Sequence, residues 1–176
     1  MAAEPPVRAN VAPAAMEDGP AILFEAVRVP AQVDQAQWLV RVADGSMVLL
    51  EQERWASPLA DELREALREI LVRRYGAVEG AGATGAEARA WRVRVDVSRF
   101  ESTPGLARLE ATWTLTPRKA SAGPALRCVA HLEQAAANDS MNALAAAHRE
   151  AVLRLGDAIG EQLLALQRGA AGRCPA

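Results

Sequence analysis

The segment at residues 53–59 limits the possible folds of this chain more than any other segment, because it joins a predicted β-hairpin directly to a predicted amphipathic helix. Before it, residues 37–50 form two apolar stretches around an Asp-Gly pair at 44–45, which favours a two-residue type I′ turn. After it, Ser57 can cap a helix whose first position is Pro58. A hairpin that leads straight into a helix favours folds in which helices pack on a sheet.

The predicted hairpin carries apolar residues on both of its faces. With a two-residue loop, Val40 is expected opposite Leu49, and Arg41 opposite Val48. A sheet that is covered on one side alternates apolar and polar residues more cleanly. The hairpin is therefore expected either to be buried on both sides or to present an apolar side to a partner.

The helix after the junction has one apolar face and ends at a glycine. Gly76 is expected to stop it, because glycine readily adopts the left-handed conformation at a helix C-terminus. The apolar positions recur at helical spacing and are expected to face the sheet; they are Leu59, Leu63, Leu67, Ile70 and Leu71.

The remaining strands and the second helix follow from apolar patterns elsewhere in the chain. A first strand is expected at 22–29, before the hairpin. In the second half, alternating apolar residues predict a three-stranded meander at 91–100, 109–115 and 126–132. A long helix follows, capped by residue 138, 139 or 140. We therefore expect an α+β fold of two layers, with a mainly antiparallel sheet, two helices packed on one side, and the order βββαβββα.

The chain is expected to contain one domain. Residues 20–168 form that domain, since 176 residues with 51% hydrophobic content can bury a substantial core. The Ala- and Pro-rich residues 1–19 are expected to be a disordered tether, and residues 169–176 a disordered tail. Residues 77–90, rich in Gly and Ala, are expected to be a mobile loop.

The two cysteines of the chain do not indicate a fold built on disulfides. Cys128 falls on the inward face of a predicted strand, where we expect a buried free thiol, and Cys174 lies in the predicted tail. A disulfide between them is the alternative in an oxidising compartment.

Residues typical of catalysis are scarce, so no enzyme activity, cofactor or metal site is expected. Neither His131 nor His148 lies at metal-ligand or triad spacing. His148 interrupts the apolar stripe of the second helix and is expected to be a satisfied core or helix-edge residue, whereas His131 is expected at a strand surface.

The charge distribution argues against nucleic-acid binding. The formal net charge is −2, and the arginines are interspersed with acidic residues instead of forming a stripe. Arg92 and Arg94 on one strand could contact phosphates or lipid headgroups, although charged residues usually mark the solvent face of a strand.

Several short segments, in this order and spacing, resemble the ABC-type transport auxiliary lipoprotein family. Its best-known members are the paraquat-inducible C-type lipoproteins, and the similarity extends over residues 22–166. The segments that carry it are Val-Pro-Ala at 29–31, Trp-Leu-Val-Arg at 38–41, Arg-Trp-Ala-Ser-Pro-Leu at 54–59, Val-Arg-Val-Asp-Val-Ser-Arg-Phe-Glu at 93–101 and Leu-Glu-Ala-Thr-Trp at 109–113.

The resemblance implies a non-enzymatic lipoprotein that faces the periplasm from the outer membrane, as part of an MCE-type lipid transport system. The implied partners are a periplasm-spanning MCE-domain protein and an inner-membrane permease, with phospholipid as a potential ligand and a homo-oligomer as the assembly. An independent periplasmic lipid- or small-molecule-binding module is the alternative. Because a lipidation signal is not visible, the sequence is expected to begin after the native lipidated cysteine, with Met1 supplied for expression and the chain soluble.

We expect the hairpin and junction to form the partner-binding surface, because they combine two-sided apolarity with family-like residues. The alternative is that Trp55 and Leu59 only lock the helix onto the sheet, with Arg54 paired to a carboxylate. The expected partner-binding residues are Trp38, Val40, Arg41, Met47, Val48, Arg54 and Trp55.

Overall fold

The computed structural model describes residues 19–79, 90–119 and 123–175. Its elements are β1 (Ala21–Phe24), β2 (Gln37–Arg41), β3 (Met47–Arg54), α1 (Leu59–Tyr75), β4 (Val78–Glu79), β5 (Trp91–Thr103), β6 (Leu106–Pro117), β7 (Leu126–Ala135) and α2 (Met141–Gln167). The predicted order of three strands, a helix, three strands and a helix is confirmed, with the two-residue β4 as an addition. The first strand is shorter than expected, since β1 ends at Phe24.

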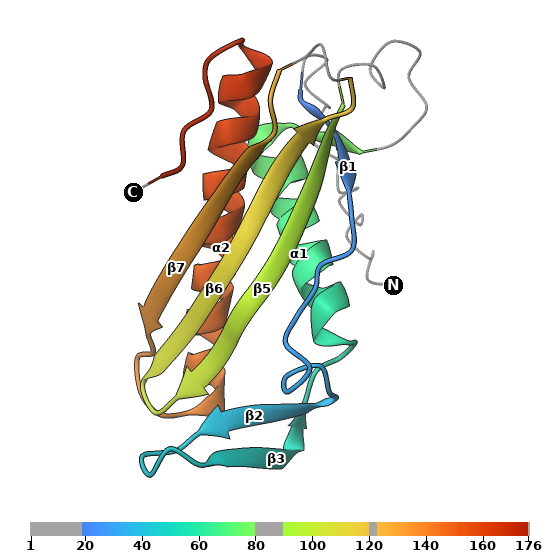
Figure 1. Ribbon diagram of the computed structural model, residues 1–176. Helices are drawn as coiled ribbons and strands as arrows, with labels where there is room; N and C mark the ends of the chain where they lie inside the picture. The colour runs from blue at the N-terminus through green and yellow to red at the C-terminus, as the bar shows by residue number, and fades with distance from the viewer. Residues whose placement is uncertain (1–18, 80–89, 120–122, 176) are drawn as a thin grey trace, which may run out of the picture.

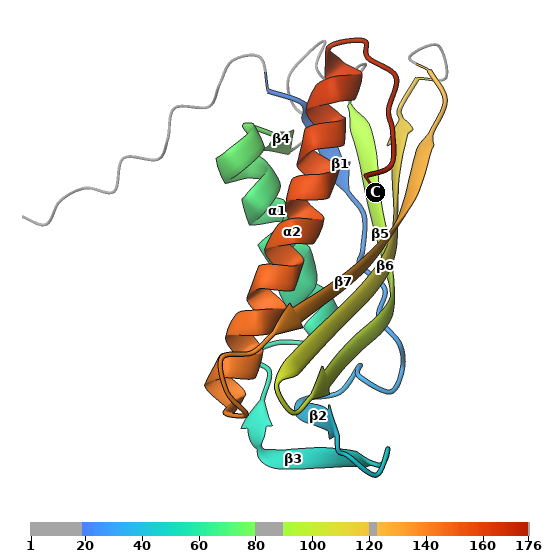
Figure 2. The same ribbon diagram turned by 90° about the vertical axis from the view of Figure 1, so that its left-hand side faces the viewer.

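Strands β5, β6 and β7 form the antiparallel meander that the alternating residues predict. The apolar residues of β5 and β6 on one face are buried, and Val93, Val95 and Trp113 among them are fully buried. On β7, Cys128 is buried and the apolar residues beside it are partly buried. Both helices lie on this one side of the sheet, as Figure 2 shows. The two-layer α+β fold is therefore confirmed.

The edge of the sheet beside β5 is mixed rather than antiparallel. β1 pairs in parallel with the start of β5, and β2 pairs in parallel with its end, through Val40 and Ser102. β1 also pairs with β4, which directly follows α1. The β2–β3 hairpin consequently lies at one end of the molecule and β1 runs toward the other (Figure 1).

The hairpin register differs by one residue from the predicted one. Val40 pairs with Val48, and Arg41 with Met47. The cause is the loop: the Gly45 amide donates to the Val42 carbonyl (2.9 Å), the Val42 amide donates to Ser46 (3.0 Å), and Gly45 has a φ of +86°. These features are typical of a three-residue loop with glycine in the left-handed position, so the predicted two-residue type I′ turn is wrong.

Helix α1 ends as predicted but starts differently. Gly76 adopts the left-handed conformation and terminates it, and four of the five predicted apolar positions are buried, with Ile70 partly buried. The helix begins one residue later than predicted, at Leu59, and Ser57 does not cap it. Instead the Ser57 amide and hydroxyl donate to the Glu62 carboxylate at 3.0 and 2.8 Å, which ties the junction to the first turn.

Helix α2 packs closely on α1 through two glycines. A Cβ atom at Gly156 would lie 2.7 Å from the Ile70 side chain, and one at Gly160 would collide with the ring of Tyr75. Ser140 caps the helix by accepting from the Ala143 amide at 3.2 Å. Together these features fix the two helices as one layer over the meander.

The C-terminal segment is fastened to β7 by a disulfide. Cys128 and Cys174 are bonded, with Cα atoms 5.3 Å apart, so the expectation of a free thiol at Cys128 is wrong. The Arg173 amide also donates to Gln162 on α2, at 2.9 Å. The pairing joins an inward strand position to residues outside any regular element, which periodicity cannot reveal. All but Gly19 of the expected tether at 1–19, and most of the expected loop at 77–90, lie outside the described residues, and the domain boundaries stay a prediction.

Candidate docking surface

The seven predicted partner-binding residues lie together in the hairpin and junction, but at different depths. Trp38 and Val40 are buried, with 8% and 9% of their surface exposed, and Trp55 is partly buried. Val48 is 39% exposed and Arg54 is also exposed, while Arg41 and Met47 are intermediate. The hairpin therefore divides into residues that support it and residues that a partner can contact.

Four rings in contact with one another support the hairpin. Trp38 stacks on Trp55 with centroids 4.3 Å apart, and Trp55 meets Phe100 of β5 edge-on at 5.7 Å. Phe100 in turn stacks on His148 of α2 at 4.1 Å. Such pairs add to the stabilisation from burial alone. The cluster joins the hairpin, the sheet and the second helix.

A buried chain of hydrogen bonds runs beside these rings. The Trp38 indole Nε1 donates to Ser102 Oγ at 2.8 Å, and Ser102 Oγ is 2.8 Å from His148 Nε2. Burial lowers the pKa of His148 to about 4, so the ring is neutral at physiological pH. The expectation of a core histidine is confirmed, although its Nδ1 has no hydrogen-bond partner among the described residues.

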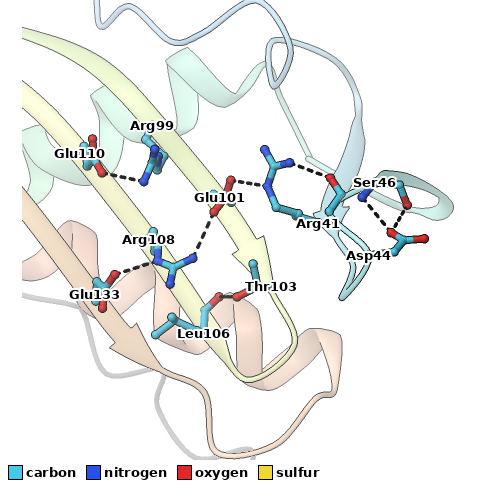
Figure 3. A network of polar contacts seen from close by, with 11 residues as sticks. Arg41, Asp44, Ser46, Arg99, Glu101, Thr103, Leu106, Arg108, Glu110 and Glu133 are labelled. Atoms are coloured by element: carbon cyan, nitrogen blue, oxygen red, sulfur yellow. Dashed lines mark hydrogen bonds and ion pairs between the residues drawn. The ribbon is translucent and has the colours of Figure 1, made fainter.

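An ion-pair network on the outer face of the sheet also anchors the hairpin (Figure 3). Arg41 Nε lies 2.7 Å from Glu101 Oε2, and the other oxygen of Glu101 lies 3.3 Å from Arg108, which pairs with Glu133 at 2.7 Å. Burial raises the pKa of Glu101, but hydrogen bonds and charge from Arg41 and Arg108 outweigh it and hold that pKa below its usual value. Arg41 also donates to the Gly45 carbonyl at 2.9 Å, which fixes the hairpin loop.

The outer edge of β3 is the part of the hairpin that can accept a partner. β3 ends the sheet, because β2 is its one neighbour among the described strands. Val48 and Leu49 are 39% and 42% exposed, and consecutive strand residues point to opposite faces. We call Met47, Val48 and Leu49 with the unpaired backbone beside them the hairpin edge. An exposed apolar strand edge can bind another chain by strand addition or by apolar contact.

Sequence reasoning missed Leu49 as a surface residue. The predicted register placed it opposite Val40, which is buried, whereas the structure pairs it with Leu39. The proposed pairing of Arg54 with a carboxylate is not seen, since Arg54 forms no ion pair with a described residue. The signal that did point here was the apolar character of both hairpin faces.

A groove of about 660 Å³ lies between the helices next to the hairpin. Its walls include Leu63 and Ile70 of α1 and Val152 of α2, and the Trp55 and Phe100 rings contribute at the hairpin end. The volume is within the range of small-molecule sites. Because the groove is open along one side, it differs from the closed pocket expected of a carrier.

Comparison with known proteins decides the family. Residues 3–160 match the family described as the ABC-type transport auxiliary lipoprotein component. The chain belongs to this family. The predicted resemblance is thus confirmed, and this auxiliary lipoprotein carries the hairpin and junction motifs within the matched region.

Two solved structures share the fold of this auxiliary lipoprotein. An uncharacterised protein is 20% identical with a TM-score of 0.71, and the alignment covers 82% of this chain and 92% of that one. A Xanthomonas campestris protein of the DUF330 family is 19% identical with a TM-score of 0.65, covering 86% and 87%. At these identities the likeness establishes the fold alone. No functionally curated protein is significantly similar to this chain.

Two further features of the described residues concern metal ligands and helix length. Within 19–79, 90–119 and 123–175, no three His, Cys, Asp or Glu side chains gather closely enough to hold a metal ion. None of the helices in the same part of the auxiliary lipoprotein is long and apolar enough to cross a membrane.

Proposed function

We propose that this auxiliary lipoprotein is a non-enzymatic periplasmic subunit of an MCE-type intermembrane lipid transport system. It is anchored at the outer membrane and docks the periplasm-spanning MCE-domain protein, which in turn connects to an inner-membrane permease. The observation that carries this proposal is the hairpin edge, an exposed apolar strand edge with no described strand on its outer side. Four contacting rings and an ion-pair network hold it in place.

The arrangement of the molecule supports a docking role. The chain enters the domain at β1, which pairs with β4 beyond the C-terminus of α1, whereas the hairpin precedes the N-terminus of α1. A helix of 17 residues is about 25 Å long, so the tethered end and the hairpin edge are separated by roughly that distance. A lipoprotein held to a membrane at one end can then present the hairpin to a partner at the other.

The disulfide supports a location outside the cytosol. Disulfides persist in oxidising compartments such as the periplasm and are rare in reducing ones. The Cys128–Cys174 bond therefore agrees with an envelope protein.

The double substitution Val48→Asp with Leu49→Asp tests the docking role. Introducing two carboxylates into an apolar contact should lower capture of the MCE-domain protein at least about tenfold, because the cost of burying unpaired charges exceeds the roughly 1.4 kcal/mol that a tenfold change requires. The measurement is co-purification of the full-length lipidated protein and its variants from native membranes after crosslinking, with captured proteins identified by mass spectrometry.

Val129→Asp is the matched control, because Val129 is 50% exposed but lies on β7, away from the hairpin edge. It should capture the MCE-domain protein as the wild type does, with all proteins melting at similar temperatures. Equal capture by the hairpin variant and the control would contradict the docking role.

The groove between the helices favours a second candidate function, an independent lipid-binding module. Its apolar lining and volume of about 660 Å³ suit a hydrocarbon chain. Stoichiometric lipid in organic extracts of the purified protein would support this function, and protein free of lipid would count against it.

A further inference from the structure

A hollow on the outer face of the sheet gathers positive charge that the docking role does not use. Its volume is about 420 Å³, and three strands contribute to it. Arg92 and Arg94 come from β5, Thr114 and Thr116 from β6, and Arg127 from β7. We call this group the basic hollow.

Strand register fixes the spacing of these side chains. Arg94 pairs with Thr114, and Thr114 pairs with Arg127 on its other side, while Arg92 pairs with Thr116. Neighbouring strands are about 4.8 Å apart, so the Cα atoms of Arg94 and Arg127, two strands apart, lie within about 10 Å of each other. Because the strands are hydrogen-bonded, the sheet keeps these positive side chains close together.

The acidic residues nearby, Asp96 and Glu25, neutralise these arginines only in part. Asp96 is already shared, with Arg94 at 2.9 Å and Arg28 at 3.8 Å. Arg92 and Arg127 form no ion pair with any described residue, and Glu25 is the other acidic residue that lines the hollow. The hollow therefore keeps an excess of positive charge, which an anion would relieve.

The donors of the basic hollow match a phosphate group. Guanidinium groups present paired N–H donors that fit phosphate oxygens, and threonine hydroxyls supply further donors between them. We propose that the basic hollow binds the phosphate headgroups of an anionic membrane surface.

A membrane is favoured over a soluble anion by the position of the hollow. Arg92 pairs with Leu23 of β1, the strand by which the chain enters the domain. In Figure 1 this is the end of β5 opposite the hairpin. A lipoprotein is held near a membrane, so a basic face beside the entry strand lies where headgroups are available. The inference rests on the proposed function only in naming the outer membrane as the surface that the basic hollow contacts.

The test is sedimentation of the chain with vesicles of equal parts phosphatidylglycerol and phosphatidylcholine, compared with vesicles of phosphatidylcholine alone. The wild type should bind the anionic vesicles, and added salt should weaken that binding. The variant Arg92→Glu with Arg127→Glu reverses the two arginines that lack ion pairs, and its binding should fall about tenfold or more.

Arg154→Glu with Arg168→Glu is the control, because it changes the net charge equally at two exposed positions of α2 and its C-cap that line neither the groove nor the basic hollow. It should retain most of the vesicle binding. Equal losses in both double variants, or none in the basic-hollow variant, would overturn the proposal. Calorimetric binding of inorganic phosphate without preference for anionic vesicles would also overturn it, by assigning the hollow to a soluble anion.

The outcome is separable from that of the docking proposal. The basic-hollow variant should still capture the MCE-domain protein, because it leaves the hairpin edge unchanged. The Val48→Asp, Leu49→Asp variant should still bind anionic vesicles. If each double variant lost both capture of the MCE-domain protein and binding to anionic vesicles, the proposal of two separate surfaces would be wrong.

Discussion

At the scale of single residues, the most informative polar group is His148, which is 3% exposed between Phe100 and Ser102. Its hydrogen bond through Ser102 reaches the indole of Trp38, so the position of the hairpin depends on a neutral imidazole. The sequence indicates that His148 is buried, because it occupies an apolar helical stripe. It does not indicate the partners, because Trp38 and Ser102 are 110 and 46 positions away in chain order.

The buried histidine predicts a loss of stability in acid. The folded-state pKa is about 4 and the ordinary value is 6.5, so between these values the unfolded chain binds a proton that the folded chain does not. Stability contributed by neutral His148 is therefore complete above pH 6.5 and is lost as the pH falls toward 4. The difference corresponds to about 3 kcal/mol at most.

The variant His148→Phe should lack this component, because phenylalanine keeps the ring stack but does not titrate. Urea unfolding at pH 7, 5.5 and 4.5 measures it: the wild type should lose more free energy of unfolding than the variant as the pH falls. Carboxylates such as Glu101 titrate in both proteins and cancel in the comparison. Parallel pH profiles would show that His148 is not buried as described.

At the scale of elements, periodic patterns were reliable guides and turns were not. The helix stripes and the alternation in β5, β6 and β7 are repeated many times, so one atypical residue such as His148 does not obscure them. The hairpin register depends on a single loop, and the Asp-Gly pair at 44–45 fits both a two-residue and a three-residue loop. The residues expected to bind a partner form one segment of the sequence, but which of them are buried and which are exposed depends on that register.

The disulfide is an element-scale feature that no pattern in the sequence reveals. It closes a separation of 46 residues between β7 and the C-terminal segment. Cys174→Ser should lower the free energy of unfolding by about 3 to 4 kcal/mol, because the unfolded chain regains the entropy of that loop. Cys174 is exposed, so the substitution removes little packing.

Chemical denaturation without reductant measures this effect. Wild-type protein treated with reductant should unfold at the same denaturant concentration as the variant, and the oxidised wild type should unfold later. An identical midpoint for the oxidised wild type and the variant would contradict a structural role for the bond.

At the scale of the whole molecule, the fold separates two surfaces along its length. The hairpin edge lies at one end, where β2 meets the last residues of β5. The basic hollow includes Arg92, which pairs with β1 at the start of β5. Figure 1 shows the hairpin and β1 toward opposite ends of the molecule. In the roles proposed above, one end faces the membrane and the other faces a partner. These roles require a rigid body between the two ends, which the ring cluster and the packed helices provide.

Site-specific photo-crosslinking in cells tests the docking role most directly. A photoreactive amino acid would replace Val48 in the full-length lipidated protein, with a second variant carrying it at Val129 as the comparison. We predict a crosslink to an MCE-domain protein from position 48 and none from position 129. A crosslink to that protein from position 129 alone, or from neither position, would contradict docking through the hairpin edge.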